Sequence, residues 1–272
     1  MTRPRRTGPP LDGGVFDGWM PDGVVFDCDG LLVDTEPCWS VAESELFARR
    51  GLPFGVEQKR LLIGKSLAAA GAVLEEAFGE PGQAAAIGAE LEALVAEVIA
   101  DQAQPMPGAR TVVDLTAARV PVAVASNSSR RLLDLALRRG SFADTFTVSI
   151  AADEVGHPKP APDLYLEACT RLGIAPARGL AFEDSLTGMR AAVAAGLRLV
   201  SVPTLTQPGL PGDWILPSLD HASLIDWITA WPTTGHVSTR DRAAGQETSH
   251  CHHAGVMDDQ RDPITEFGER GR

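Results

Sequence analysis

The chain has 272 residues, 44% of them hydrophobic, which is enough for one large domain or two modest ones with a real core. It has 24 basic and 36 acidic residues, and this net charge of -12 makes nucleic acid a poor candidate partner. The sequence has no apolar run of membrane length, no secretory signal, and four cysteines without a pairing spacing. We therefore expect a cytoplasmic protein with reduced thiols and no membrane partner.

The two ends of the sequence differ from its middle. Residues 1–20 are rich in proline and glycine, which predicts a disordered leader. Residues 233–272 contain no leucine and few large apolar side chains, so they cannot bury much surface and are predicted to form a disordered tail.

Between these ends, short apolar runs alternate with helical patterns. The runs at residues 24–28, 121–126, 145–150, 180–183 and 198–202 have little polar alternation, which is typical of parallel strands covered on both faces. Amphipathic segments at residues 109–118, 130–139, 162–172 and 186–195 predict helices, and residues 223–231 predict a short closing helix. This alternation predicts an α/β fold with a doubly wound, Rossmann-like, mostly parallel sheet.

One interval is too long for this pattern. More than ninety residues, nearly all helical in character, separate the first predicted strand from the second. A crossover connection does not need that length, whereas an inserted helical domain does. We place this domain at residues 37–104, which leaves residues 21–36 and 105–232 to form the core.

Polar side chains follow the ends of several predicted strands, where ligands bind in open α/β sheets. "VVFDCDG" and "FEDS" supply acids, "VASNS" supplies a hydroxyl and an amide, and the loop "GHPKPAPD" supplies a lysine. The residues are Asp27, Asp29, Ser126, Asn127, Lys159, Glu183 and Asp184.

Each residue type has a chemical reason to be at this edge. Several carboxylates at one point repel unless a cation joins them, and hard oxygen ligands of this kind suit Mg²⁺. A lysine beside a hydroxyl and an amide can hold a phosphoryl group, which one carboxylate attacks while a second moves protons. Each feature alone also has a simpler interpretation, such as a turn, a calcium ligand or a solvated lysine. Their occurrence in order favours the catalytic interpretation.

These motifs resemble the haloacid dehalogenase-like superfamily, in its β-phosphoglucomutase and sugar-phosphatase branch. The resemblance covers about residues 24–203 and rests on "FDCDGLLVDTEP", "VASNSS", "HPKPAPDLY" and "FEDSLTGMRAAVAAG". It implies a catalytic nucleophile and an acid/base, Asp27 and Asp29, and Mg²⁺ bound by Asp27, Asp29 (through its backbone carbonyl) and Asp184, with Glu183 at or near the metal. It also implies that Ser126, Asn127 and Lys159 bind the phosphoryl group and that Gly30 leaves room for it.

The same resemblance makes the insertion a helical cap, which closes over a small phosphorylated metabolite. Mutases of this branch carry a histidine where this chain has Trp39, and a lysine and an arginine that flank the Gly-x-Ser of the cap segment. Here that segment is "IGKSL" at residues 63–67, which lacks both flanking cations. We therefore expect a phosphatase of a small sugar or polyol phosphate. A β-phosphoglucomutase-like mutase is one alternative, and a catalytically silent protein that binds a metabolite or a partner is another.

Overall fold

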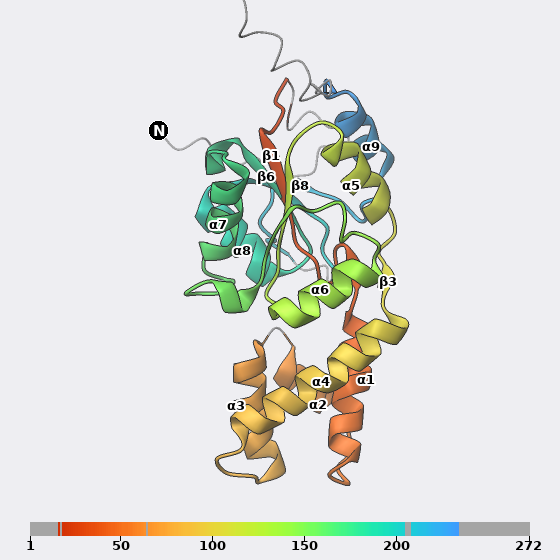
Figure 1. Cartoon of the computed structure of the whole chain (residues 1–272), viewed down its shortest axis with the longest axis vertical. Helices are drawn as coiled ribbons and strands as arrows, with labels where there is room; N and C mark the ends of the chain where they lie inside the picture. Colours follow the sequence, from red (N-terminus) through yellow and green to blue (C-terminus); the bar gives the residue numbers. More distant parts are fainter. Residues whose placement is uncertain (1–15, 17, 64, 205–207, 234–272) are drawn as a thin grey trace, which may run out of the picture. The chain divides into compact units, whose positions relative to one another are not determined.

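The computed structural model of the chain describes residues 16, 18–63, 65–204 and 208–233 (Figure 1). The predictions for residues 1–15 and 234–272 lie outside these ranges. Six strands form a parallel sheet in the order β5-β4-β1-β6-β7-β8. Their bounds are β1 Gly23–Phe26, β4 Val122–Ala125, β5 Val148–Ile150, β6 Gly179–Glu183, β7 Arg198–Ser201 and β8 Trp214–Ile215. The predicted doubly wound α/β sheet is therefore confirmed.

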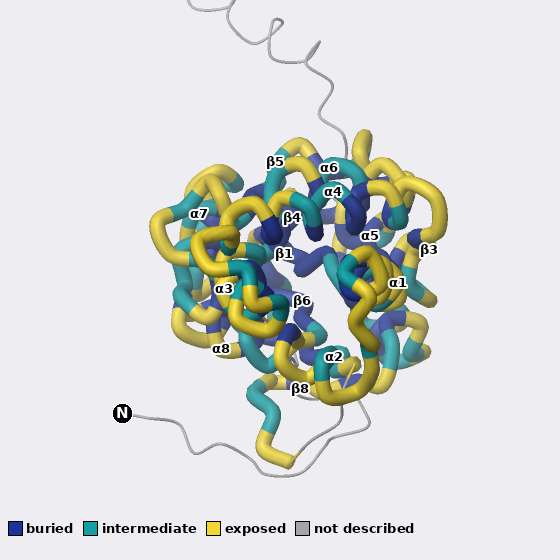
Figure 2. The backbone as a smooth tube through the Cα atoms, turned by 90° about the horizontal axis from the view of Figure 1, so that it is seen from below, coloured by how far each residue is buried: buried dark blue, intermediate teal, exposed yellow. Residues whose placement is uncertain are grey.

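The two faces of the sheet are covered by different helices. Helices α5 (Ala109–Ala117), α6 (Arg130–Arg139) and α9 (Ala222–Thr229) share a buried cluster with Val24 and Phe26 of β1. Helices α7 (Asp163–Leu172) and α8 (Leu186–Ala195) share a second cluster with Val25. Successive side chains of a strand point to opposite faces, so β1 is buried on both sides, as the dark blue strands in Figure 2 show.

A helical insertion interrupts the chain between β1 and the rest of the sheet. It contains α1 (Glu36–Ala48), α2 (Val56–Leu62), α3 (Leu67–Phe78) and α4 (Ala84–Gln102). Two short strands, β2 (Val33–Asp34) and β3 (Gln104–Pro105), flank it and pair antiparallel with each other. The chain therefore enters and leaves the insertion through two neighbouring strands.

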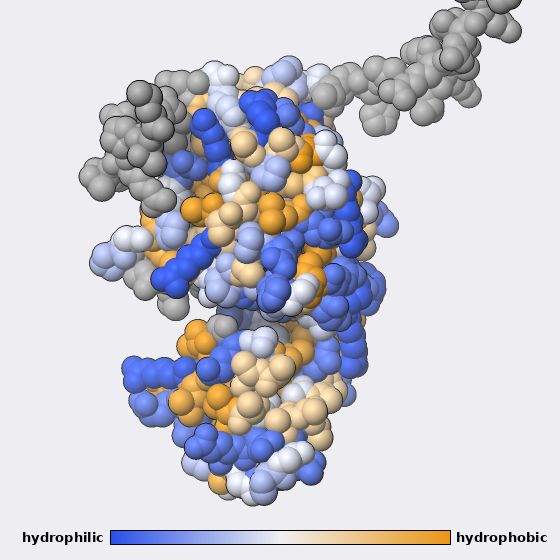
Figure 3. Space-filling model, turned by 90° about the vertical axis from the view of Figure 1, so that its left-hand side faces the viewer, coloured by the Kyte–Doolittle hydropathy of each residue, from blue (hydrophilic) through white to orange (hydrophobic). Residues whose placement is uncertain are grey.

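Among the described residues, the insertion exposes more large apolar side chains than the rest of the chain does. Those with at least 38% exposure in the insertion are Val41, Leu52, Val56, Leu61 and Ile63. In Figure 3 the insertion is the lower part, and hydrophobic surface (orange) is visible on the face shown. No helix within the described residues is long and apolar enough to cross a membrane.

Three features differ from the sequence predictions. Strand β8 and the β2–β3 pair were not predicted, because two-residue strands have too few residues to show a periodicity. The third run forms a strand only at Val148–Ile150, because the backbone N–H of Thr145 instead donates to Phe142 O in a turn. The sheet itself does not depend on any of these differences.

The prediction of a disordered leader over residues 1–20 is wrong for its last part. Phe16 is only 1% exposed, and its ring stacks on Trp227 with ring centres 4.7 Å apart. Trp214 contacts the same ring edge-on, and Trp19 lies beside it. Burial of these aromatic rings against β8 and α9 stabilises a segment whose proline and glycine content had suggested disorder.

Candidate active site

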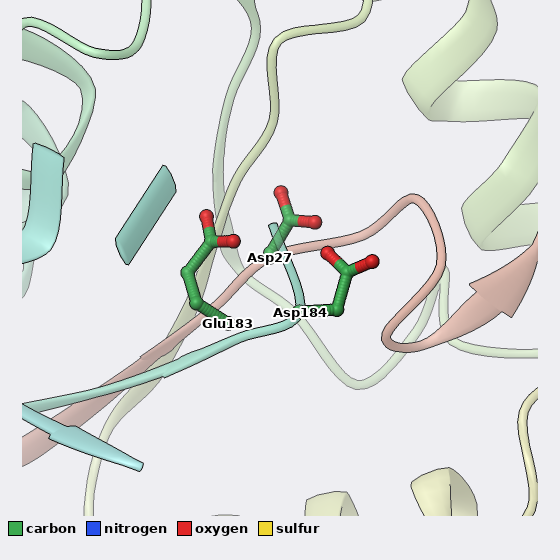
Figure 4. Close-up of side chains that lie close together, drawn as sticks. All are labelled: Asp27, Glu183 and Asp184. Atoms are coloured by element: carbon green, nitrogen blue, oxygen red, sulfur yellow. The ribbon is translucent and has the colours of Figure 1, made fainter. Parts of the chain in front are cut away.

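The predicted site residues meet at the carboxyl end of the sheet because β1 pairs with both β4 and β6. Asp27 directly follows β1, Ser126 follows β4, and Glu183 is the last residue of β6. This is the point where the strand order reverses, which is where doubly wound sheets bind ligands. Figure 4 shows the carboxylates of Asp27, Glu183 and Asp184 gathered there from two neighbouring strands.

Lys159 joins two of these carboxylates. Its Nζ atom lies 2.5 Å from Asp27 Oδ1 and 2.6 Å from Glu183 Oε1, and all three residues are at most 6% exposed. Burial alone would lower the pKa of Lys159, but the two adjacent carboxylates outweigh it and raise that pKa above its ordinary value. Lys159 is therefore a fixed positive charge in this site.

Protein donors occupy both oxygens of the Glu183 carboxylate. Oε1 accepts from Lys159 and from the Tyr165 hydroxyl (2.8 Å), and Oε2 accepts from the backbone N–H (3.2 Å) and the hydroxyl (3.1 Å) of Ser185. A Cβ atom at Gly188 would lie 1.7 Å from Oε1, so the carboxylate fits only because residue 188 is a glycine. Glu183 is thus held as a partner of Lys159 by four protein donors.

Asp184 is arranged differently. Its Oδ2 atom accepts a hydrogen bond from Thr204 Oγ1 (2.5 Å), whereas its Oδ1 atom is buried and has no hydrogen-bond partner within the described part of the chain. Burial, followed by the charge of Glu183, raises the pKa of Asp184 to about 7. A buried carboxylate oxygen without a partner is costly, so this atom indicates that a cation belongs beside it.

The carboxylates are close enough to share one cation. Ligand oxygens of Asp27, Glu183 and Asp184 lie within 4.8 Å of one another. Burial, followed by the Glu183 charge, raises the pKa of Asp27 well above its ordinary value. Hard oxygen donors around an unpartnered oxygen fit a small divalent ion such as Mg²⁺. Because Glu183 is saturated, Asp27 and Asp184 are the side chains that fit this ion best.

Asp29 is held by three hydroxyl groups. Oδ1 accepts from Thr35 (2.9 Å), and Oδ2 accepts from Ser126 and Ser128 (2.8 Å each). A hydroxyl has one hydrogen to donate, so the hydrogen of Ser126 is already engaged in its hydrogen bond to Asp29 in this arrangement. A phosphoryl oxygen bound by Ser126 would have to replace Asp29 as the acceptor.

Asn127 and Gly30 complete the group of predicted residues. The Asn127 side chain accepts from Lys159 N (2.8 Å) and donates to Lys159 O (3.1 Å), so it fixes the backbone of the loop that carries the lysine. Gly30 has a φ of 80°, and a Cβ atom there would lie 2.5 Å from Asp184 Oδ2. Glycine allows both this left-handed turn and the close approach of the carboxylate.

Sequence reasoning missed five residues that the structure brings into the site. They are Thr35, Ser128, Tyr165, Gly188 and Thr204, and each contacts or makes room for one of the predicted acids. Ser128 had a signal, since it stands in "SNSS" after a predicted strand. The others lie on a helix or in loops, where a hydroxyl or a glycine is common without a role.

The fold and the site together define a doubly wound α/β protein with buried carboxylates and a lysine at the edge where the strand order reverses. The sequence profile of the haloacid dehalogenase-like hydrolase family matches residues 21–196. The chain therefore belongs to the haloacid dehalogenase-like hydrolase family.

Individual relatives are similar over most of their length. CbbY of Rhodobacter capsulatus is 35% identical over an alignment of 218 residues, and this alignment covers 74% of this chain and 94% of CbbY. The fructose-1-phosphate phosphatase YqaB of Escherichia coli is 33% identical over an alignment of 189 residues, and this alignment covers 67% of this chain and 97% of YqaB. A crystal structure of CbbY from Rhodobacter sphaeroides in complex with phosphate has a TM-score of 0.66 at 28% identity, covering 74% of this chain and 95% of that one.

Proposed function

We propose that the protein is a Mg²⁺-dependent phosphatase that hydrolyses a small sugar or polyol phosphate through an aspartyl-phosphate intermediate. The observation that supports this most is the buried Asp27–Lys159–Glu183 group together with Asp184, whose buried Oδ1 atom has no partner among the residues that the structure describes. Among the relatives, YqaB is a phosphatase of a sugar phosphate, and the solved CbbY structure holds phosphate.

Asp27 is proposed as the nucleophile. Among the described residues, the hydrogen bond to its side chain is made at Oδ1, by Lys159. The other oxygen, Oδ2, attacks phosphorus, so that an O–P bond forms as the bond from phosphorus to the leaving oxygen breaks. Lys159 holds the Asp27 carboxylate in one orientation and offsets the negative charge that a phosphoryl group brings.

Asp29 is proposed as the acid and base. Protonated, it gives its proton to the leaving sugar oxygen; as a carboxylate, it then takes a proton from the water that attacks phosphorus and releases phosphate from Asp27. The hydroxyls of Thr35, Ser126 and Ser128 fix the direction in which the carboxyl points. Ser126 can transfer its hydrogen bond from Asp29 to a phosphoryl oxygen when substrate arrives.

The ion would be held by the side chains of Asp27 and Asp184 and by the backbone carbonyl of Asp29. When bound, Mg²⁺ would offset the charge of the carboxylates and of the phosphoryl oxygens. Glu183 is proposed to act through Lys159 and not as a direct ligand, since four protein donors already occupy its oxygens.

The helical insertion is proposed as the cap that contacts the sugar. Ile63, which is 54% exposed, and Leu67 stand where mutases of this family have a lysine and an arginine. A mutase must hold a phosphate at both ends of its substrate, which requires such cations. The apolar residues at these positions therefore favour a phosphatase over a mutase.

The test is hydrolysis of p-nitrophenyl phosphate and of a panel of sugar and polyol phosphates, with Mg²⁺ and with EDTA. We expect Mg²⁺-dependent release of phosphate that falls by about 10⁴-fold or more in Asp27→Asn, because the nucleophile is lost. An unchanged rate in Asp27→Asn would contradict the proposed chemistry. Isomerisation of glucose 1-phosphate in place of hydrolysis would contradict the choice of a phosphatase.

Asp29→Asn separates the two roles of the acid and base. p-Nitrophenolate leaves without a proton, whereas a sugar alkoxide needs one. We expect the variant to release about one equivalent of p-nitrophenol per enzyme and then stall, and to release almost no sugar from a sugar phosphate. Equal losses in the first turnover on both substrates would contradict the role of Asp29 as the acid.

A further inference from the structure

Thr204 lies beside the proposed metal site although it belongs to none of the family motifs. It comes three residues after the end of β7, the neighbour of β6 in the sheet. The backbone N–H of Val202 donates to Glu183 O (2.7 Å). This hydrogen bond extends the pairing of β6 and β7 by one residue beyond the end of β7. The loop after β7 is therefore held beside Asp184.

The Thr204 hydroxyl fixes one oxygen of Asp184. Thr204 Oγ1 donates to Asp184 Oδ2 at 2.5 Å, and Gly30 approaches the same oxygen so closely that a Cβ atom there would lie 2.5 Å away. Asp184 Oδ2 is thus confined between a hydroxyl and a turn of the backbone. The carboxylate cannot turn about its axis without breaking the hydrogen bond to Thr204.

Because Oδ2 of Asp184 is fixed, the orientation of the other carboxylate oxygen, Oδ1, is fixed as well. Oδ1 of Asp184 is buried and has no hydrogen-bond partner among the described residues, and Asp184 offers one carboxylate oxygen to the group that it forms with Asp27 and Glu183. Groups that form hydrogen bonds to a metal ligand orient that ligand, and loss of such a group commonly lowers metal affinity by about 10- to 100-fold. Glu183 provides a contrast, since protein donors bond to both of its oxygens.

We propose that Thr204 is a positioning residue for the divalent cation: its hydroxyl holds Asp184 Oδ2 so that Oδ1 points at the ion. The inference rests on the proposed function only in requiring that the site binds Mg²⁺. Thr204 touches neither the phosphoryl group nor the proton-transfer residues in this role. Its loss should weaken metal binding and leave catalysis at saturating Mg²⁺ nearly intact.

The experiment measures Mg²⁺ binding to the full-length, metal-free protein by calorimetry, without substrate. In Thr204→Val, which keeps the shape of the side chain but removes the hydroxyl, we expect the Kd for Mg²⁺ to rise by about 10-fold or more. Thr204→Ser keeps the hydroxyl and should remain within about 2-fold of wild type. In steady-state assays, the Mg²⁺ concentration for half-maximal rate should rise in Thr204→Val while kcat at saturation changes little.

A control variant removes a threonine hydroxyl elsewhere. Thr170 on α7 bonds to the backbone carbonyl of Leu166, so Thr170→Val should leave the Kd for Mg²⁺ unchanged. Thr204 is exposed, so its valine variant should melt at the wild-type temperature in EDTA; Thr204→Ala, measured in the same way, gives an independent test of the hydroxyl. An unchanged Kd for Mg²⁺ in both Thr204→Val and Thr204→Ala overturns the inference about Thr204 and leaves the proposed function standing. Absence of Mg²⁺ binding by wild type overturns it together with the metal of the proposed function.

Discussion

The side-chain nitrogen of Lys159 lies 2.5 Å from Oδ1 of Asp27, although 132 positions separate the two residues in the chain. Glu183 takes a second hydrogen bond from the same nitrogen at 2.6 Å. One buried cation thus stands between two buried carboxylates, and each of the three depends on the others to remain charged out of water. Stability and chemistry are therefore linked in this group.

Removal of the cation should destabilise the folded protein. In Lys159→Met, two buried carboxylates lose their positive partner, and we expect the free energy of unfolding at neutral pH to fall by about 3–5 kcal/mol. Urea unfolding of the metal-free protein measures this loss. The control is Arg60→Met, which breaks an exposed pair with Glu57 and should change the free energy of unfolding very little. Equal effects of the two substitutions would contradict the importance of the buried group.

The metal-free protein should lose stability as the pH rises. Burial, followed by the Glu183 charge, raises the pKa of Asp184 from 3.8 to about 7, so the folded state binds this proton more tightly than the unfolded state. The bound proton stabilises the folded state fully below the ordinary pKa of 3.8. This stabilisation is lost as the pH rises from there through the folded-state pKa of about 7. We expect the Tm in EDTA to fall between about pH 5 and about pH 8, and Mg²⁺ to restore most of it at the upper end.

Asp184→Asn provides the comparison for this pH dependence. It removes the titrating group and keeps the size of the side chain, so its Tm in EDTA should depend less steeply on pH over the same range. Mg²⁺ should also stabilise it less than it stabilises wild type. Parallel curves for the two proteins would show that other groups cause the pH dependence.

A methyl group at position 188 should displace the Glu183 carboxylate and so disrupt the site. The Cβ atom of Gly188→Ala would lie 1.7 Å from Glu183 Oε1, so the helix α8 or the carboxylate must move. We expect a loss of about 3 kcal/mol in the free energy of unfolding and a large fall in kcat, because Lys159 shifts with Glu183. In Gly55→Ala, the added atom meets Gln58 Oε1 at an ordinary 3.5 Å, and neither quantity should change much.

The aromatic contact of the N-terminal segment should matter for stability alone. Phe16→Ala removes a ring that is 1% exposed and stacks on Trp227, so we expect a loss of about 3 kcal/mol. KM should stay at the wild-type value, because this cluster lies on β8 and α9 and not at the site. Val56→Ala, at a position 68% exposed, is the control for a surface truncation. Wild-type stability of Phe16→Ala would show that the segment does not contribute to the fold.

The sheet could be predicted because its strands are buried on both faces and therefore appear in the sequence as continuous apolar runs. Five of the six strands of the parallel sheet correspond to such runs. The exception, β8, has two residues and depends on its neighbour β7 for its conformation. Phe16 was missed for a similar reason, since its partner Trp227 lies near the opposite end of the described chain.

It could be predicted that the acids, Ser126 and Lys159 lie close together, because the ends of parallel strands converge on one edge of a sheet. The residues that hold them could not. Thr204 reaches Asp184 across 20 positions and Ser128 reaches Asp29 across 99, and a hydroxyl in a loop has no feature in the sequence that names its partner. The saturation of Glu183 by its four donors was likewise visible only in three dimensions.

The pairing of Val33 with Pro105 and of Asp34 with Gln104 has a consequence for how such an enzyme diversifies. Strands paired in this way lie about 5 Å apart, so the insertion with its four helices is connected to the rest of the chain through the adjacent strands β2 and β3. Replacement of residues 36–103 by another helical segment, or by a short loop, would leave the anchor points where they are. If the insertion contacts the substrate as proposed, selection for a new substrate would act on residues 36–103 while the residues at the carboxyl end of the sheet stay unchanged.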